Sequence, residues 1–434
     1  MIPSKTFITI IALWTISALF IAFYPLFAFP WQVAGVVVMF LSLWDLQRLR
    51  KIPLPEIQRE ISSNLAHGET TLVRLYLKTT LRSSTYIQIY DDIPPSFQHA
   101  SMPVTLSLEP DEINSIEYQL KPLNRGNAVF RFTFIRLHSP LQLWCRQIRI
   151  DNESEIKVYP NFSAITKYAL LALDNRESVL GIQQKRLRGE GSEFHQLREY
   201  RQGDSQRQID WKASIRLQKM ISREYQQDRD QKILFLLDCG RRMTARDGAY
   251  SHFDEALNSL LLLGYVALRQ GDAVGMQCFG YDNRFLKPIK GLGTIKRLLN
   301  FSYDLKAELM APDYMAAVKN LLVHEKRRSL VIWLTNLRDD DAEELLPAIQ
   351  LLKKHHLVLI ANLKENLLDT LDKTIPDNFQ QALSVSAAIG FQQRRQQAFK
   401  NLSREGVILI DTTPAELPSA LVNAYLEIKA SSKL

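Results

Sequence analysis

The sequence predicts an α/β protein: a doubly wound parallel sheet preceded by a β-sandwich-like module and a two-helix transmembrane hairpin. Three observations predict this fold class. Residues 6–44 carry no charged side chain, residues 55–160 alternate apolar and polar residues with period two, and apolar runs alternate with amphipathic stretches after residue 230. The chain is too long for one ordinary core. We therefore expect four segments: 1–50, 55–160, 161–230 and 231–434.

Composition indicates a folded chain without a disulfide framework. Hydrophobic residues make up 46% of the sequence and charged residues 23%, which is typical of packed domains rather than of disorder. Cys145, Cys239 and Cys278 lie far apart with no CxxC pair, which argues against a zinc site and fits a reducing compartment. The net charge of +8 suits anionic lipid, nucleic acid or no particular partner.

The uncharged amino end predicts membrane insertion. One span needs about 20 apolar residues, so the run holds two short spans with a break near Pro25 and Pro30. A cleaved signal peptide would have a shorter apolar region and a small-residue cleavage site. Arg48, Arg50 and Lys51 come after the second span, whereas the connecting loop is uncharged. We expect residues 6–46 to contact the lipid bilayer and the rest of the chain to lie in the cytoplasm.

The next segment, residues 55–160, predicts antiparallel strands. The stretches "TLVRLYLKT", "SIEYQL" and "AVFRFTFIRL" alternate with period two, and turn signals such as "HGE", "DDIPPS" and "LNRGN" separate them. Short strands at this spacing are typical of a small sandwich. No nucleophile, histidine pair or acidic cluster stands out, so we expect a structural or interaction module.

Residues 161–230 end in a dense, mixed charged run. Eleven basic and eight acidic residues lie between Gln183 and Gln231, a balance typical of a solvated surface with internal ion pairs. We expect an ordered extension that packs on the following domain, and no nucleic acid. The alternative is a nucleic-acid-binding protein or an uncharacterised enzyme that uses segment 185–229, because four aromatic residues are interleaved there: Phe194, Tyr200, Trp211 and Tyr225.

From residue 231 the pattern predicts parallel strands with helices between them. "KILFLLD", "AVGMQCF", "SLVIWLTN", "LVLIANL" and "GVILID" are apolar runs of strand length. Ligands of such sheets bind beyond the carboxyl ends of the strands, where Asp238 and Asn336 fall. The chain has no G-x-x-x-x-G-K-[ST] loop, no H-E-x-x-H helix and no G-x-S-x-G elbow. We therefore expect no enzyme activity and no catalytic residues.

One long motif carries a resemblance to a known family. The stretch "REYRQGDSQRQIDWKASIRLQKMISREY" is similar to the signature of family fifty-eight of the domains of unknown function, whose usual form is R-x-Y-x-x-G-D-x-x-R-x-I-D-W-x-A. The upstream "RGNAVF", "SPLQLW" and "IKVYP" also resemble that family. The matching positions are Arg198, Tyr200, Gly203, Asp204, Arg207, Ile209, Asp210, Trp211 and Ala213, followed by Arg223 and Glu224.

The resemblance implies a von Willebrand factor A-like domain on a multi-pass protein of the bacterial inner membrane. It also implies a MoxR-type AAA+ ATPase as partner, together with a client protein, in complex assembly or maturation. No established activity comes with the family. The expected function is that of a membrane-anchored cytoplasmic scaffold or adaptor, and the partner rests on analogy alone.

The resemblance further implies a degenerate metal-ion-dependent adhesion site. Domains of this type bind a cation through D-x-S-x-S, a threonine and a second aspartate. Here Asp238 remains, Gly240 and Arg242 stand for the serines, Asp313 lies near the threonine position, and Asn336 replaces the second aspartate. Because hydroxyl and carboxylate ligands are lost and a fixed positive charge is added, we expect no Mg²⁺ and no other cofactor.

Two questions about these residues stay open from sequence alone. The guanidinium of Arg242 could pair with Asp238, and Arg241 or Arg242 could bind a partner's carboxylate directly. The alternative is an exposed arginine turn beside a vestigial aspartate. Likewise Trp211, with Tyr200, Asp204 and Arg223 around it, is either a packing anchor, the favoured interpretation, or part of a partner surface.

Overall fold

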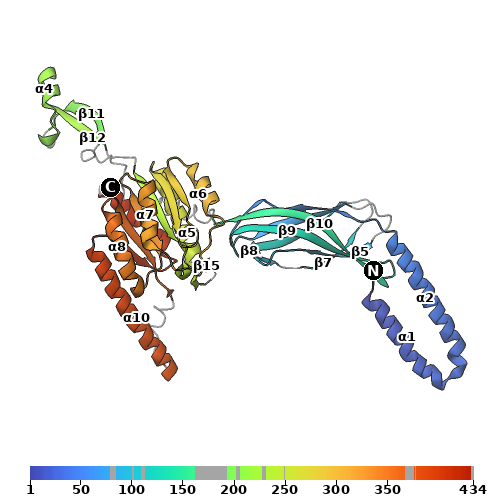
Figure 1. The fold of residues 1–434 in the computed structure, drawn as a ribbon. Coiled ribbons are helices and arrows are strands. Elements are labelled where there is room, and N and C mark those ends of the chain that lie inside the picture. Colours follow the sequence, from blue (N-terminus) through green and yellow to red (C-terminus); the bar gives the residue numbers. More distant parts are fainter. Residues whose placement is uncertain are drawn as a thin grey trace. The chain divides into compact units, whose positions relative to one another are not determined.

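The computed structural model describes residues 1–78, 85–99, 102–108, 113–161, 193–201, 206–226, 231–248, 250–366, 376 and 378–431 (Figure 1). The chain divides into two compact units, Met1–Tyr159 and Pro160–Leu434. Helices and several separate sheets are present, so the predicted mixed α/β class is confirmed. The four-segment division predicted from sequence is finer than these two units.

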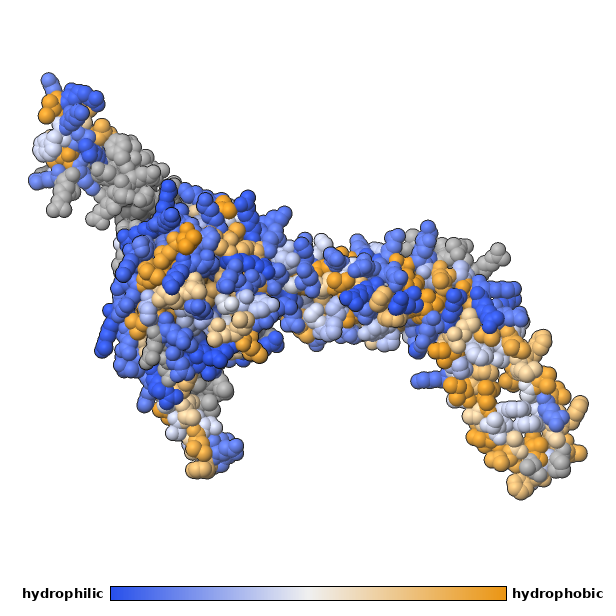
Figure 2. Space-filling view, viewed as in Figure 1, coloured by the Kyte–Doolittle hydropathy of each residue, from blue (hydrophilic) through white to orange (hydrophobic). Residues whose placement is uncertain are grey.

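The amino-terminal unit begins with apolar helices. α1 (Lys5–Phe23) starts at Ser4, whose hydroxyl accepts a hydrogen bond from the Phe7 amide (3.2 Å), and η1 (Pro25–Phe27) leads into α2 (Ala28–Arg50). Among the described residues, α2 is the one helix long and apolar enough to span a membrane, whereas the apolar stretch Lys5–Ile21 of α1 is shorter. Hydrophobic side chains cover much of the visible surface of both helices (Figure 2).

Two β-sheets complete this unit. One has the order β1-β10-β9-β5-β7, with β3 pairing to β10, and the other has the order β2-β4-β8-β6. Alternate side chains of both sheets fill one shared core, including Leu75, Ile87 and Phe130. The strands are β1 (Ile2–Pro3), β2 (Glu56–Glu60), β3 (Asn64–Ala66), β4 (Thr71–Lys78), β5 (Thr85–Asp91), β6 (Phe97–His99), β7 (Val104–Leu108), β8 (Ile113–Pro122), β9 (Gly126–His138) and β10 (Trp144–Tyr159).

The second unit starts with a small hairpin that holds the signature. β11 (Glu193–Glu199) pairs antiparallel with β12 (Ile221–Gln226), and η2 (Gln206–Gln208) and α4 (Trp211–Leu217) lie between them in sequence. Asp210 caps α4 by accepting a hydrogen bond from the Ala213 amide (3.0 Å). The turn after α4 places Gln218 at a positive φ of 53°.

The rest of the second unit is built on a six-stranded sheet of order β17-β16-β13-β18-β19-β20. Five neighbouring strands are parallel, and the edge strand β17, which was not predicted, runs antiparallel to β16. The strands are β13 (Lys232–Asp238), β16 (Ala273–Phe279), β17 (Phe285–Ile289), β18 (Leu330–Thr335), β19 (Leu357–Leu363) and β20 (Ile408–Thr412). A separate two-residue pair, β14 (Arg246–Asp247) and β15 (Tyr250–Ser251), precedes α5.

Helices lie against both faces of this sheet (Figure 1). Phe235 packs in the core formed with α5 (His252–Arg269), α6 (Thr294–Ser302) and α11 (Leu417–Ala430). Leu234 and Leu236, which point to the other face, pack in the core formed with α7 (Tyr314–His324) and α8 (Ala342–Lys353). The described helix α10 (Phe379–Arg404) leads to β20, and the short η3 (Arg241–Thr244) and η4 (Asp339–Asp341) come after β13 and β18.

Candidate functional site

The carboxyl edge of the six-stranded sheet holds Asp238, the last residue of β13. Its side chain is buried, and both carboxylate oxygens are engaged: one accepts from the Gly240 amide (2.7 Å) and the other from the Thr335 hydroxyl (2.7 Å). Burial raises the pKa of Asp238 to about 6, although the bonds from Thr335 and Gly240 and the charge of Arg242 act in the opposite direction. Each oxygen of the Asp238 carboxylate thus accepts a hydrogen bond from a donor within the chain.

Gly240 stands where the resemblance implied the first serine, and the structure leaves no room for a side chain there. A Cβ at this residue would lie 2.9 Å from the Asp238 carboxylate and 2.9 Å from the Pro312 ring, closer than a side chain tolerates. The Arg241 amide also donates to the Met310 carbonyl (2.9 Å), so the loop before α7 packs directly on this turn. A serine side chain at residue 240 would therefore displace the loop before α7. This close approach of the backbone is the physical reason for a glycine at this position.

Arg242 does not pair with Asp238 as the sequence suggested. Its ion pair is with Asp341, and both side chains are largely buried. Burial is the main cause of a lowered pKa for the Arg242 guanidinium. Arg241, by contrast, is exposed. Of the two arginines, Arg241 is the one whose side chain is accessible to a partner's carboxylate.

The other two predicted edge residues serve local structure. Asp313 is exposed and caps α7 by accepting from the Ala316 amide (2.8 Å). Asn336 is buried with its amide nitrogen 3.1 Å from Nδ1 of His252, and the other nitrogen of that ring lies 3.0 Å from the Asp247 carboxylate. The Asp313 and Asn336 side chains are thus both engaged away from Asp238.

Two residues at this edge were missed by sequence reasoning. Thr335 binds Asp238 and directly precedes Asn336, so its place at the end of β18 was a usable signal. Tyr314, the first residue of α7, is buried, and its hydroxyl has no hydrogen-bond partner among the described residues. Burial, and next the charge of Asp238, raise the pKa of Tyr314. No sequence pattern marks that hydroxyl.

Magnesium is expected not to bind at this edge. In the part of the chain that the structure describes, no group of three or more His, Cys, Asp or Glu side chains could hold a metal. Isothermal titration of Mg²⁺ into the purified protein should therefore give only the heat of dilution. A saturable heat that disappears in Asp238→Ala would contradict this prediction.

The signature residues within the described ranges mostly stabilise their own hairpin. The Asp210 carboxylate caps α4 and pairs with Arg223 (2.9 Å); the Ala213 amide and then Arg223 lower its pKa. Lys219 pairs with Glu199 (2.6 Å), and the Tyr200 amide donates to the Met220 carbonyl (2.8 Å). Arg198 donates to a neighbouring carbonyl. Gly203 and Asp204 lie outside the described residues, as do the side chains of Arg207 and Glu224.

Trp211 departs from the favoured expectation of a packing anchor. Its side chain is 62% exposed, and Ile215, one helical turn later on the same face, is 80% exposed. Leu217 and Met220 are also exposed. The helix is held by its cap and by the Ser214 hydroxyl, which accepts from the Ile221 amide (2.9 Å), rather than by the indole. Trp211 and Ile215 thus form an exposed apolar pair on one side of the helix, which we call the α4 face.

The fold and the site define a mixed α/β protein with an apolar amino-terminal helix. At one sheet edge the Asp238 carboxylate is bonded by the chain itself, and the helix α4 of the signature motif is exposed. The family described as "Protein of unknown function DUF58" matches residues 196–392. The matched residues all lie in the second unit and make up less than half of the chain. No curated protein matches the chain.

Similarity to solved structures is low throughout. An Escherichia coli alpha-2-macroglobulin fragment that spans domain MG7 to the C-terminus shares 14% identity over 25% of this chain, with a TM-score of 0.22, and the match covers 17% of that fragment. A FixG-related protein from Vibrio parahaemolyticus shares 10% identity over 24% of this chain and 94% of its own, with a TM-score of 0.17. Similarity this low identifies neither a fold family nor a function.

Proposed function

We propose that this protein is a membrane-anchored cytoplasmic adaptor that binds another protein through the α4 face. The proposed partner is a MoxR-type AAA+ ATPase that acts on a client protein in complex assembly or maturation. The observation that carries the proposal is the joint exposure of Trp211 and Ile215 on a helix that its own cap holds in place. Exposed tryptophans are the typical anchors of protein interfaces.

The architecture supports this proposal at two further points. Helices on both faces of parallel strands favour a doubly wound, von Willebrand factor A-like domain. The stacked rings of Trp14 and Trp31 (centroids 4.2 Å apart) join α1 to α2, which favours a two-span hairpin. The basic cluster of Arg48, Arg50 and Lys51 favours the cytoplasmic side of a bacterial inner membrane for residues 52–434.

The charge pattern of the signature favours a protein partner over nucleic acid. Lys219 and Arg223 are both paired with carboxylates of the same hairpin. Nucleic-acid surfaces present a one-sided array of cations to the phosphates instead. Nucleic-acid binding or an enzyme activity of segment 185–229 remains the alternative, and a salt-sensitive nucleic-acid signal among the material copurified with the chain would favour it.

Trp211→Ala is expected to abolish recovery of the partner without unfolding the chain. Truncation of a central aromatic anchor costs about 2 kcal/mol or more of binding, at least about thirtyfold in affinity, whereas an exposed side chain contributes roughly 0.5 kcal/mol or less to stability. Copurification from membranes in mild detergent, with mass spectrometry of the recovered proteins, measures the first effect. Thermal unfolding measures the second.

Phe379→Ala is the matched control for this experiment. Phe379 is also an exposed aromatic residue, 81% accessible, but lies on α10 instead of α4. The control should recover the ATPase as the wild type does. Loss of folding in Trp211→Ala would restore the packing-anchor interpretation, and unchanged recovery would exclude the α4 face as the docking surface.

A further inference from the structure

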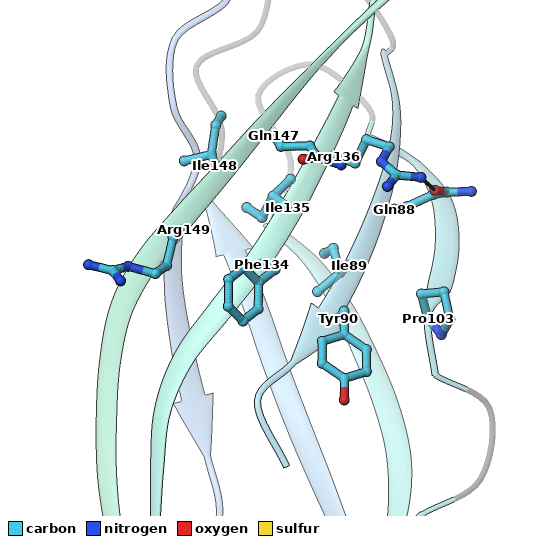
Figure 3. Close-up of a pocket in the computed structure, with 10 residues that line it drawn as sticks. All are labelled: Gln88, Ile89, Tyr90, Pro103, Phe134, Ile135, Arg136, Gln147, Ile148 and Arg149. Atoms are coloured by element: carbon cyan, nitrogen blue, oxygen red, sulfur yellow. Dashed lines mark hydrogen bonds between the residues drawn. The ribbon is translucent and has the colours of Figure 1, made fainter. Parts of the chain in front are cut away.

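The outer face of the first sheet, opposite its core, carries an open hollow of about 450 Å³ (Figure 3). β5, β9 and β10 place two cross-strand rows there, Gln88–Arg136–Gln147 and Tyr90–Phe134–Arg149. Tyr90 and Phe134 are both exposed, with ring centroids 6.4 Å apart. The hollow thus combines an aromatic floor with two arginines, and we call it the sheet groove.

The two cations of the sheet groove are only weakly neutralised by the described residues around them. Arg136 donates to the neutral side-chain oxygen of Gln88 (3.3 Å). The Arg149 guanidinium lies 4.4 Å from the centroid of the Phe132 ring, and the acidic Asp151 is 3.9 Å away with both side chains exposed. An exposed pair at that distance contributes little, so both arginines can attract an anion.

A dense hydrogen-bond network ties the same strands to the end of α2. The buried Asp45 carboxylate accepts from the Ser139 hydroxyl (2.5 Å) and from the amides of Leu141 (3.0 Å) and Leu143 (3.3 Å) at the β9–β10 turn. The Trp144 indole donates to the Ser42 hydroxyl (3.0 Å). The turn is therefore held at the end of the apolar helix, where Leu141 remains exposed.

This attachment sets the distance between the sheet groove and the hydrocarbon layer of the membrane. Asp45 is the first charged residue after the uncharged run, so it marks the boundary of the apolar layer. Arg136 is three residues along β9 from Ser139, roughly 10 Å at about 3.3 Å per residue. The headgroup layer is about 5–8 Å thick on each side of a bilayer. A long arginine side chain spans the remaining gap.

We propose that the sheet groove binds the anionic headgroups of the cytoplasmic leaflet, with Arg136 contacting phosphate and Arg149, two residues farther from the turn, adding to the positive charge that attracts it. The inference rests on the membrane anchor of the proposed function. Charge complementarity and continuity with α2 favour lipid over an acidic protein segment. The groove then orients the first unit on the bilayer surface, in addition to anchoring by the helices.

The test is electron paramagnetic resonance on the full chain in nanodiscs. A nitroxide at Gln147→Cys reports from the groove, and the native cysteines of the described chain are buried and so protected from labelling. The discs contain phosphatidylcholine alone or mixed with phosphatidylglycerol, plus a trace of gadolinium-chelate lipid. Relaxation of the label should increase when phosphatidylglycerol is present. The increase should vanish in Arg136→Glu/Arg149→Glu.

Arg131→Glu is the matched control, because Arg131 is an exposed arginine of the same strand five residues farther from the turn than Arg136. It should retain the phosphatidylglycerol response. Equal relaxation in both lipid compositions would overturn the proposal, as would a double variant that loses a copurifying protein while keeping the lipid response. A chain that enters neither disc would instead overturn the membrane anchor itself, and the groove with it.

Discussion

Asp91→Ala is expected to lower the free energy of unfolding of the unit Met1–Tyr159 by about 3–5 kcal/mol. Asp91 and Arg59 form an ion pair with both side chains fully buried, and Arg59 Nε donates to the Asp91 carboxylate (2.9 Å). Tyr118 (2.5 Å) and Thr133 (2.9 Å) donate to the same carboxylate. The alanine variant leaves the Arg59 charge and two hydroxyl groups buried without their acceptor.

Hydrogen–deuterium exchange of the amides of β5 and β9 measures this loss strand by strand. Glu117→Ala is the matched control, because Glu117 pairs with Arg74 (2.7 Å) on the same unit but both side chains are about half exposed. Its effect should be too small to resolve, since exposed pairs are screened by water. Equal effects in the two variants would show that the Arg59–Asp91 network does not hold the two sheets together.

Asp238→Asn is expected to stabilise the sheet of the second unit at neutral pH by about 3 kcal/mol. Burial raises the folded-state pKa of Asp238 to about 6, above its ordinary value of 3.8. Between these values the folded chain keeps a proton that the unfolded chain releases. Stability from this group is therefore complete below about pH 4 and is lost as the pH rises to about 6. Asparagine removes the titration but retains hydrogen-bonding capacity toward Gly240 and Thr335.

Urea unfolding between pH 4 and pH 7, compared between wild type and variant, measures this difference. The gap should widen as the pH rises and then level off above about pH 6. Asp313→Asn is the control, because Asp313 is an exposed helix cap and asparagine caps about equally well. A wild-type chain that gains stability relative to Asp238→Asn over this interval would show that the carboxylate is stabilised rather than penalised by its surroundings.

Local sequence patterns predicted the individual strands of this chain better than the way the strands pair in the sheets. Periodicity located β4, β9 and the apolar strand β13 because side-chain burial follows the strand repeat. It did not indicate β17, whose half-buried "FLKPI" lies at the sheet edge and contains a proline. Edge strands lack the continuous apolar run by which buried parallel strands are found.

The residues at the end of β13 could be found from the sequence, but their contacts could not. Asp238 and Gly240 were readable, whereas the Thr335 bond to Asp238 joins residues 97 positions apart. Strand register and loop packing decide such contacts, and neither can be read from a local pattern. The pairing of Arg242 with Asp341 is of the same kind. For Trp211, a tryptophan among charged residues favoured a packing anchor, and the exposure of its side chain could be seen only in the structure.

Photo-cross-linking from position 215 in living cells decides whether the α4 face binds a partner. A benzophenone side chain at Ile215, 80% exposed, reacts with whatever lies against this face. If the α4 face docks the ATPase, a cross-link to a AAA+ protein forms and is lost when Trp211→Ala is added. A cross-link confined to the chain's own residues 231–434 would contradict this role, because the signature would then be packing on its own domain.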